Sequence, residues 1–574
     1  MILLDIKEKD GYMTINDLPH NCIFNKVRTG CGGTTIALTN EENYVIAVPT
    51  TELIINKCSN NENYFGFYGK FTKKLKEELN YYIQNHACKK IVCTYNKVPK
   101  LLELIDTKEY RLLVDEYHNL LKQYAFRDDA IDGVLDNFRK FKSFCFLSAT
   151  PIKMEFKPEV LKDVPEYTAD WKEEQKVTIA PIQTKCPYQL AANFINHYQT
   201  NGYLDIKGKR TYEAFFFLNS VKDIARIITI CGLTNDDCRV ICSTDSKNKD
   251  KLGDIEISNS LSPSKKFTFM TSKSFEGSDF FSETGLSFVI SNVHVKHTLA
   301  SIDLDLPQIA GRIRNKDNPF KNTVVHIFST KNDESFISYE DYKKGEKREL
   351  ELARERVDAL NKLSPEAREQ QAKEKSLYIR YVDGKFEVDD RKINYKMYEY
   401  KLLHQIYNSK EGIEQAYDET NISYKKISWA PMNKKAIEKY QKKPDFLKMV
   451  ERYSDLKYSF DNTRTQIERL YPFINEAIRI LGVDRIIKLR TQTAVKEAVA
   501  KAKIAKRPSR EEMLHMLSQD IHLGKIYTKE KMDEICEKYG VTIRELKRLY
   551  KIDCCTKWIN GASKYVYIIT GTQA

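Results

Sequence analysis

Residues 27–35 read V-R-T-G-C-G-G-T-T, and they follow a short apolar run at Cys22–Val27. A helix-like segment, Thr34–Thr39, comes directly after them. A strand, a glycine-rich turn and a helix in this order are typical of a phosphate-binding loop, because backbone N–H groups and the helix dipole favour an anion there. Thr34 stands where such loops place the hydroxyl that binds Mg²⁺. The motif has Lys immediately before that hydroxyl, and this chain has Gly33.

The front of the chain alternates short apolar runs with helix-like segments. The strand candidates of residues 1–165 are Cys22–Val27, Tyr44–Pro49, Lys90–Thr94, Arg111–Val114 and Ser143–Leu147. Helices are expected between them at Thr34–Thr39, Thr51–Asn56, Phe71–Tyr82, Val98–Ile105 and Ala130–Arg139. This alternation predicts a parallel sheet with helices on both faces, and ligands bind such sheets at the carboxyl ends of the strands. Those ends carry Thr29–Thr35, Pro49–Thr51, Thr94–Tyr95, Asp115–Glu116 and Ser148–Thr150.

The run R-L-L-V-D-E-Y-H at Arg111–His118 is an apolar strand that ends in two carboxylates. The strand pleat sends neighbouring side chains to opposite sides, so Asp115 and Glu116 are expected to have different roles. In a nucleotide site the first carboxylate would hold Mg²⁺, and the second would orient or deprotonate the attacking water. The alternative is an ordinary strand-to-helix junction with acidic capping residues.

A second set of alternating runs occupies residues 166–335. Its strand candidates are Ala214–Leu218, Arg239–Cys242, Lys266–Met270, Leu286–Ile290 and Thr323–Phe328, with helices such as Leu190–Gln199 and Val221–Cys231 between them. Two further stretches carry polar residues, F-M-T-S-K-S-F-E-G-S-D-F at Phe269–Phe280 and P-Q-I-A-G-R-I-R-N at Pro307–Asn315. The arginines of the second stretch suit phosphate recognition, because a guanidinium is a rigid and always charged fork.

Taken in order, T-G-C-G-G-T-T, V-P-T-T, T-Y, D-E-Y-H and S-A-T resemble the motifs of the first RecA-like motor domain of helicase superfamily two. The resemblance implies an ATP·Mg²⁺ site in which Thr34 and Asp115 hold the metal and Glu116 is the catalytic carboxylate. The residues that it implies for ATP binding are Thr29, Gly30, Cys31, Gly32, Gly33, Thr34 and Thr35. Those that it implies for coupling between domains are His118, Ser148 and Thr150, and those for nucleic-acid contacts are Pro49, Thr50 and Thr94.

The second set of runs is similar to the second motor domain of the same family. F-F-F-L-N-S at Phe215–Ser220 resembles the strand and Asn-Ser pair that open this domain in many members. The E-G-S-D stretch resembles the fifth motif. It implies Thr271 on the nucleic-acid side, with Gly277 and Asp279 near the nucleotide.

The Q-x-x-G-R sequence at Gln308–Arg312 matches the sixth motif of the family. The match implies that Gln308 and Arg312 are catalytic residues directed at the γ-phosphate, with Arg314 close behind. The usual pattern has its last Arg three residues after the first, where this chain has Asn315.

Length and composition set wider limits. A chain of 574 residues suggests three or four domains at roughly 150 residues each. Its 13 cysteines include no Cys-x-x-Cys pair, which favours reduced thiols in an intracellular protein. Met1–Asp5 is apolar but charged residues follow at once, so no signal peptide is expected, and no run approaches the ~18 apolar residues of a membrane span. We expect a cytoplasmic protein without a membrane partner.

The net charge of +13 is unevenly distributed. Residues 341–574 hold 49 Lys and Arg against 36 Asp and Glu, whereas residues 1–340 hold 44 of each sign. A basic back half indicates an anionic partner, and nucleic acid is the commonest one. The alternative is a lysine-rich helical surface that is merely solvated, with the many Tyr side chains packed in its core.

The back half divides at a basic stretch. Residues 336–505 read as charged and helical, with a hairpin at Tyr378–Asp390 around Asp383–Gly384. After Lys506–Ser509, helices are expected at Arg510–Ile521, Lys529–Tyr539 and Thr542–Leu549, then strands at Tyr550–Cys554 and Tyr565–Ile569 joined near Asn560–Gly561. This order resembles a winged helix, a module that binds nucleic acid or docks proteins, with Arg544, Lys547 and Arg548 on the recognition helix.

The sequence therefore predicts an α/β protein with two RecA-like parallel-sheet motor domains at 1–165 and 166–335, a charged helical region at 336–505 and a winged-helix module at 506–574. The expected function is a nucleic-acid-dependent ATPase that acts as a helicase or translocase on DNA, with DNA more favoured than RNA, in replication or DNA remodelling. The Lys-, Asn- and Tyr-rich composition hints at a phage or mobile element, and a replication protein is a possible partner for the C-terminal region.

One residue keeps a second hypothesis open. Because Gly33 replaces the expected Lys, the chain could be a nucleic-acid-binding scaffold that binds ATP but has lost efficient hydrolysis. A kinase or transporter loop is less favoured, since neither class combines D-E-x-H, S-A-T and Q-x-x-G-R. In a working ATPase, Lys26, Arg28 or another basic side chain would have to reach the β- and γ-phosphates in place of the absent Lys.

Overall fold

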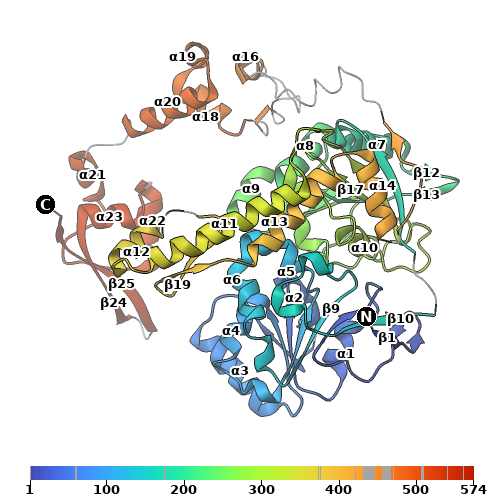
Figure 1. The fold of residues 1–574 in the computed structure, drawn as a ribbon. Helices are drawn as coiled ribbons and strands as arrows, with labels where there is room; N and C mark the ends of the chain where they lie inside the picture. Colours follow the sequence, from blue (N-terminus) through green and yellow to red (C-terminus); the bar gives the residue numbers. More distant parts are fainter. Residues whose placement is uncertain are drawn as a thin grey trace. The chain divides into compact units, whose positions relative to one another are not determined.

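The computed structural model describes residues 2–58, 61–172, 176–372, 374, 376–420, 422–430, 446–455, 464, 467–468, 471–505, 510–539, 541–559 and 562–573. The chain forms two compact units, Met1–Gln441 and Lys442–Ala574 (Figure 1). No helix of the described residues is long and apolar enough to cross a membrane.

The first RecA-like domain is an eight-stranded parallel sheet. In spatial order its strands are β1 (Ile2–Asp5), β10 (Glu166–Asp170), β4 (Cys22–Asn25), β9 (Ser143–Ser148), β8 (Arg111–Asp115), β5 (Tyr44–Val48), β7 (Lys90–Thr94) and β6 (Tyr64–Phe67). All five strands expected from the sequence are present. The edge strands β1 and β6 and the inner strand β10 were not expected, and β10 carries the sheet five residues past the expected boundary at residue 165.

Helices cover both faces of this sheet (Figure 1). They are α1 (Gly33–Thr39), α2 (Thr51–Cys58), α3 (Lys73–Asn85), α4 (Val98–Leu101), α5 (Asn119–Lys122) and α6 (Tyr124–Leu135). Alternate residues of one strand enter different cores: Val45 and Ala47 of β5 lie in one apolar cluster, and Ile46 and Val48 lie in the other. A strand buried on both faces reads as a continuous apolar run, which is why the central strands could be predicted.

The second RecA-like domain is also a parallel sheet. Its strands are β15 (Cys238–Ile241), β16 (Phe267–Met270), β14 (Ala214–Phe217), β17 (Leu286–Ser291), β18 (Thr323–Phe328), β11 (Thr178–Gln183) and β21 (Ser423–Tyr424), with β22 (Ser428–Trp429) also on β11. Its helices are α7 (Pro187–Asn201), α8 (Val221–Cys231), α9 (Ser246–Leu252) and α10 (Asp305–Ala310). The last two strands come from well beyond the expected domain end at residue 335.

The segment after the second domain returns to the first. It comprises α11 (Tyr339–Leu360), α12 (Pro365–Gln371), the hairpin β19 (Ile379–Val382) and β20 (Lys385–Val388), α13 (Lys392–Tyr400), the π-helix η8 (Lys401–Ile406) and α14 (Lys410–Glu419). Met397 and Tyr398 of α13 are buried in the apolar core of the first domain. Leu403 and Tyr407, just beyond α13, and Tyr417 of α14 are buried in that of the second. We call residues 392–419 the strap, because they are anchored in the cores of both domains.

The second unit contains α16 (Phe446–Asp455), α18 (Ile474–Leu481), α19 (Val483–Leu489) and α20 (Gln492–Ala505). They are followed by α21 (Arg510–Leu517), β23 (Ile526–Thr528), α22 (Lys529–Tyr539), α23 (Ile543–Leu549), β24 (Tyr550–Ile559) and β25 (Ala562–Thr572). The three strands form an antiparallel sheet in the order β23-β25-β24. Two stretches named in the sequence analysis, Lys506–Ser509 at the division of the back half and Asn560–Gly561 between the last two strands, lie outside the described residues.

Candidate functional site

The glycine-rich loop joins the end of β4 to α1. Gly30 and Gly32 have positive φ angles of 67° and 86°, a conformation that glycine adopts without strain. Gly32 is the N-cap of α1, and the first backbone N–H groups of a helix do not take part in its internal hydrogen bonds. Thr34 is buried, whereas Thr35 is exposed on α1. The loop therefore has the backbone that anion binding requires.

The acidic pair stands at the end of β8, next to this loop. Thr34 Oγ1 donates a hydrogen bond of 2.7 Å to Asp115 Oδ2. Glu116 has a φ of 50°, a left-handed conformation that is strained for a residue with a side chain. Tyr95 is fully buried, and its hydroxyl lies 2.7 Å from the carbonyl oxygen of Asp115 and 3.1 Å from that of Glu116. These contacts fix the backbone at the strained residue Glu116.

Lys26 lies between the loop and the acidic pair. Its Nζ is 2.9 Å from Glu116 Oε1 and 3.9 Å from Asp115 Oδ1, and the residue is only 5% exposed. Burial alone would lower the pKa of Lys26, but attraction by Glu116 and Asp115 outweighs it and raises the pKa above its ordinary value. Burial likewise favours protonated Glu116, yet Lys26 and His118 bring the pKa of Glu116 below its ordinary value. Both side chains are therefore charged at neutral pH.

Two other cations were alternatives for the missing loop lysine. Arg28 is engaged elsewhere: its Nη1 lies 3.0 Å from Glu8 Oε1, and its guanidinium stacks 4.1 Å from the ring centre of Trp171. Lys57, in the last turn of α2, is half-buried and feels the charge of Asp115. Burial lowers the pKa of Lys57. Sequence reasoning named Arg28 but missed Lys57, which lies 24 residues after the expected lysine position.

The second domain contributes Gln308 to the acidic pair. Gln308 is fully buried on α10, and its Nε2 donates to Glu116 Oε2 at 3.0 Å and to Thr150 Oγ1 at 3.2 Å. Among the described residues, Gln308 Oε1 is a buried acceptor without a hydrogen-bond partner. An oxygen of this kind, beside a carboxylate, fits a water molecule.

The two arginines after Gln308 lie in different surroundings. Arg312 is 3% exposed, and its Nε donates to the carbonyl oxygen of Gln308 at 2.9 Å. Arg314 is half-buried, and its Nε lies 2.7 Å from Asp279 Oδ1. A side chain at Gly30 would collide with the guanidinium of Arg314, so this arginine lies directly on the glycine-rich loop.

Two more glycines allow the motor domains to approach closely. A Cβ atom at Gly277 would collide with Leu53 of α2, and one at Gly311 would collide with the side chain of Thr29. The remaining loop residue, Cys31, is buried, and its thiol donates to the carbonyl oxygen of Arg28 at 3.1 Å. Gly311 and Arg314 thus lie against the glycine-rich loop, and Gly277 lies against α2, across the domain boundary.

A buried ionic cluster joins the domains beside this site. His118 Nδ1 is 2.8 Å from Ser148 Oγ, and His118 Nε2 is 2.9 Å from Glu276 Oε1. Burial opposes ionisation of Glu276, but Lys122 and His118 hold its pKa well below the ordinary value. The backbone N–H of Thr150 donates to Ser148 Oγ at 2.9 Å. Glu276 was missed from the sequence, although it stands inside the quoted E-G-S-D stretch.

A groove of about 970 Å³ is lined by residues of both domains. It is lined by four residues that the sequence assigned to nucleic-acid contacts, Pro49, Thr50, Thr94 and Thr271. Its charged lining is mostly basic, with Arg127, Lys222, Lys251 and Lys273 against Asp223. Phe126 also lines it and is 69% exposed, at the kink where Arg127 leaves helical geometry within α6. Arg127 Nη1 donates to the carbonyl oxygen of Pro49, which holds this kink against the groove.

The three basic residues assigned to the recognition helix belong to the second compact unit. Arg544, Lys547 and Arg548 are all exposed on α23. The helix begins with a capping box, in which Thr542 and Glu545 exchange side-chain and backbone hydrogen bonds. The structure thus presents the three cations together on one stable helix.

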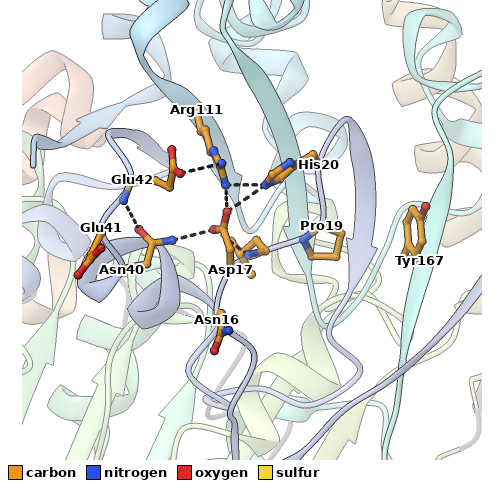
Figure 2. Close-up of a pocket in the computed structure, with 10 residues that line it drawn as sticks. Asn16, Asp17, Pro19, His20, Asn40, Glu41, Glu42, Arg111 and Tyr167 are labelled. Atoms are coloured by element: carbon orange, nitrogen blue, oxygen red, sulfur yellow. Dashed lines mark hydrogen bonds and ion pairs between the residues drawn. The ribbon is translucent and has the colours of Figure 1, made fainter.

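A second hollow, of about 840 Å³, lies at the end of the first sheet where β8 begins with Arg111 (Figure 2). Figure 2 shows Asp17 at its centre, accepting hydrogen bonds from Asn40 and His20 and paired with Arg111. Arg111 also pairs with Glu42 at 3.1 Å. These mutual contacts anchor the N-terminal segment to the sheet, so this hollow has a structural explanation.

The oxygen atoms of Thr34 and Asp115 are ligands of the kind that Mg²⁺ uses, and they would be only part of its coordination shell. Among the described residues, no group of three or more His, Cys, Asp or Glu side chains could hold a metal ion. Mg²⁺ in phosphate chemistry takes one or two protein oxygens, completed by phosphate and water. The hydroxyl of Thr34 and the carboxylate of Asp115, already hydrogen-bonded to each other, are a pair of this type.

Comparisons with known proteins agree with the motifs of the first domain. Residues 15–157 match the family described as DEAD/DEAH box helicase, a range that contains the glycine-rich loop, the acidic pair and Ser148–Thr150. No curated protein sequence matches the chain. The first motor domain is therefore similar to a helicase domain.

Solved structures with a similar arrangement are remote in sequence. Mss116p bound to ssRNA and AMP-PNP is 13% identical over 86% of this chain and 90% of that chain, with a TM-score of 0.43. Mss116 bound to ssRNA and UDP-BeF is 14% identical over 83% and 88%, with a TM-score of 0.42. Dbp5 of S. cerevisiae bound to RNA and ADP BeF3 is 13% identical over 54% and 79%, with a TM-score of 0.37.

Proposed function

We propose that the chain is a nucleic-acid-dependent ATPase of helicase superfamily two that acts as a helicase or translocase. The observation that carries the proposal is the position of Gln308. This residue of the second domain donates to Glu116 and Thr150 of the first, so the acidic pair is complete only when the domains are together. A site divided between two domains lets hydrolysis drive their opening and closing.

Each polar group of the site has a proposed task in hydrolysis. The glycine-rich loop would bind the phosphates through its N–H groups, and Thr34 with Asp115 would hold Mg²⁺. When bound, Mg²⁺ neutralises phosphate charge. Glu116 would accept a proton from the attacking water, and the free oxygen of Gln308 would accept that water's other hydrogen bond. The Arg312 guanidinium would stabilise charge on the transferred group.

The coupling residues connect this chemistry to the groove. His118 bridges Ser148 of the first domain to Glu276 of the second. Pro49 and Thr94 line the groove, and the neighbour of Thr94, Tyr95, holds the backbone of the acidic pair. A strand bound in the groove would therefore touch Thr94, whose neighbour Tyr95 is hydrogen-bonded to the backbone carbonyl groups of the acidic pair.

The proposed strand is DNA, and the proposed setting is replication or DNA remodelling. The support is the basic second unit, whose α21-β23-α22-α23-β24-β25 order resembles that of a winged helix. Arg544, Lys547 and Arg548 would contact phosphates or base edges from α23, and the same module could dock a replication protein.

The test is phosphate release from ATP, measured alone and with single-stranded DNA, duplex DNA and single-stranded RNA of one sequence. Turnover that rises at least about tenfold with one of them is expected, because Thr94 of the groove adjoins Tyr95, which holds the backbone of the acidic pair. ATP binding without turnover under any condition would favour the scaffold hypothesis, which Gly33 motivates. Equal or greater stimulation by RNA than by DNA would contradict DNA as the substrate.

A second expected result concerns Phe126. Its exposed ring lines the groove, and we propose that an unstacked base packs on it, since every base has a face that can stack on an aromatic ring. Phe126→Ala should weaken single-strand binding about tenfold, measured by fluorescence anisotropy, and Phe126→Trp should retain binding. The matched control is Tyr81→Ala, an aromatic residue of the same 69% exposure outside the groove, which should bind as the unmodified protein does. Equal affinity of the Phe126→Ala and Tyr81→Ala proteins would contradict the stacking role.

A further inference from the structure

The space beside Gly33 is already filled. Gly33 is the first residue of α1, and a Cβ atom added to it would lie 2.8 Å from Cδ2 of Leu147 and 3.4 Å from Cε of Met13. Leu147 is fully buried at the end of β9, one residue before Ser148. A lysine at position 33 would have to displace this leucine. The packing around the loop therefore fits glycine, and a lysine stem would fit only if Leu147 moved.

Lys26 is held in place at both ends of its backbone. Its N–H donates to the carbonyl oxygen of Ser148 at 2.9 Å, and its carbonyl oxygen accepts from Trp171 Nε1 at 2.9 Å. Its ammonium is nearly inaccessible to solvent, between the acidic pair and the loop. A buried, charged and fixed ammonium at this point is the kind of group that phosphate recognition uses, because burial strengthens its attraction for an anion.

We propose that Lys26 binds the β- and γ-phosphates of ATP in place of the absent loop lysine, having moved seven positions upstream to the end of β4. The inference rests on the proposed ATPase function. Arg28 does not compete for the role, because it is engaged with Glu8 and Trp171. The nearest rival is Lys57, whose burial disfavours its charged form.

The ion pair with Glu116 gives Lys26 a second role. Without an anion nearby, Lys26 occupies Oε1 of the carboxylate that would act as the base. Phosphates that attract the ammonium weaken this pair and leave Glu116 free to accept a proton from water. The same side chain would thus bind the substrate and release the base, so a bound nucleotide activates its own hydrolysis.

The experiment compares ATP affinity by isothermal titration calorimetry in the full-length protein. Lys26→Gln should weaken ATP binding about 30-fold or more, because a buried charge that faces the phosphates is removed. Lys90→Gln is the matched control: Lys90 is a lysine of the same domain that is also buried, at 3% exposure, and its Nζ donates to the carbonyl oxygen of Ala37. That control should keep the affinity of the unmodified protein. Lys57→Gln tests the rival.

A relocation test makes the assignment specific. In the Lys26→Gln background, Gly33→Lys together with Leu147→Ala returns a lysine to the usual position and makes space for it. This triple variant should recover at least about tenfold of the lost affinity, as expected when an equivalent charge again faces the phosphates. Should Lys26→Gln fail to fold by circular dichroism, Lys26→Arg keeps the charge and should retain ATP binding within about fivefold.

The outcomes separate the two proposals. If the unmodified protein binds no ATP by calorimetry, the proposed ATPase function fails, and the role of Lys26 fails with it. If the unmodified protein binds ATP and Lys26→Gln binds it equally well, only the role of Lys26 is overturned. A loss that is confined to Lys57→Gln would overturn it in favour of that residue.

Discussion

Replacing Glu116 by Gln is expected to lower ATP turnover about a thousandfold, the scale of a lost general base. The amide has the same shape and can still accept from Gln308, but it cannot take a proton from water. ATP affinity should be retained or increase, because Lys26 loses the carboxylate that holds it away from phosphates. The measurements are phosphate release at saturating ATP and calorimetric affinity, both with the stimulating nucleic acid.

The control for this result is Glu42→Gln. Glu42 pairs with Arg111 at the end of the sheet where β8 begins, so its loss should leave turnover within about twofold of the unmodified protein. Turnover by the Glu116→Gln protein that stayed within about threefold of the unmodified rate would remove Glu116 from the mechanism. The acidic pair would then be structural, and the scaffold hypothesis would gain support.

Arg312→Ala is expected to lower kcat about a thousandfold with little change in ATP affinity, the behaviour of an arginine that acts on the transition state. Arg312 is buried, and its Nε is fixed by the carbonyl oxygen of Gln308, the residue whose side chain contacts Glu116. Arg314→Ala should mainly weaken ATP binding, because Arg314 lies on Gly30 of the phosphate loop. Steady-state kinetics with calorimetry separates the two effects.

Two further variants sharpen this comparison. Arg312→Lys should recover little activity, because an ammonium lacks the planar fork that binds two phosphoryl oxygens. Arg139→Ala removes an exposed arginine that pairs with Asp163 and should change neither parameter measurably. A larger loss of kcat in Arg314→Ala than in Arg312→Ala would assign the transition-state role to Arg314.

The central strands could be predicted because both of their faces are buried, whereas strands that are short, half-exposed or interrupted by proline could not. β6 reads Y-F-G-F and is mostly half-exposed, so it resembles a loop in the sequence. β11 reads T-I-A-P-I-Q, and a proline within a run argues against a strand, yet Pro181 lies opposite His326 in the sheet. β21 and β22 have two residues each, too short for any periodicity.

The residues of the candidate site could also be predicted only in part. Motif order was enough to name Thr34, Asp115, Glu116 and Gln308, and the structure places these four in one chain of hydrogen bonds and close contacts. The ionic cluster was not accessible from one sequence, because Glu276 and His118 are 158 positions apart and their pairing depends on how the domains pack. Lys26 was one of several candidates until its distance to Glu116 separated it from Arg28.

The strap adds to the covalent connections between the two domains. The backbone passes from one domain to the other three times: between β10 and β11, between β18 and α13, and again through the π-helix η8. Three covalent connections restrict the relative displacement of the two domains more than a single linker would. The strap therefore acts as an additional tether, which keeps the two halves of the candidate site close to each other.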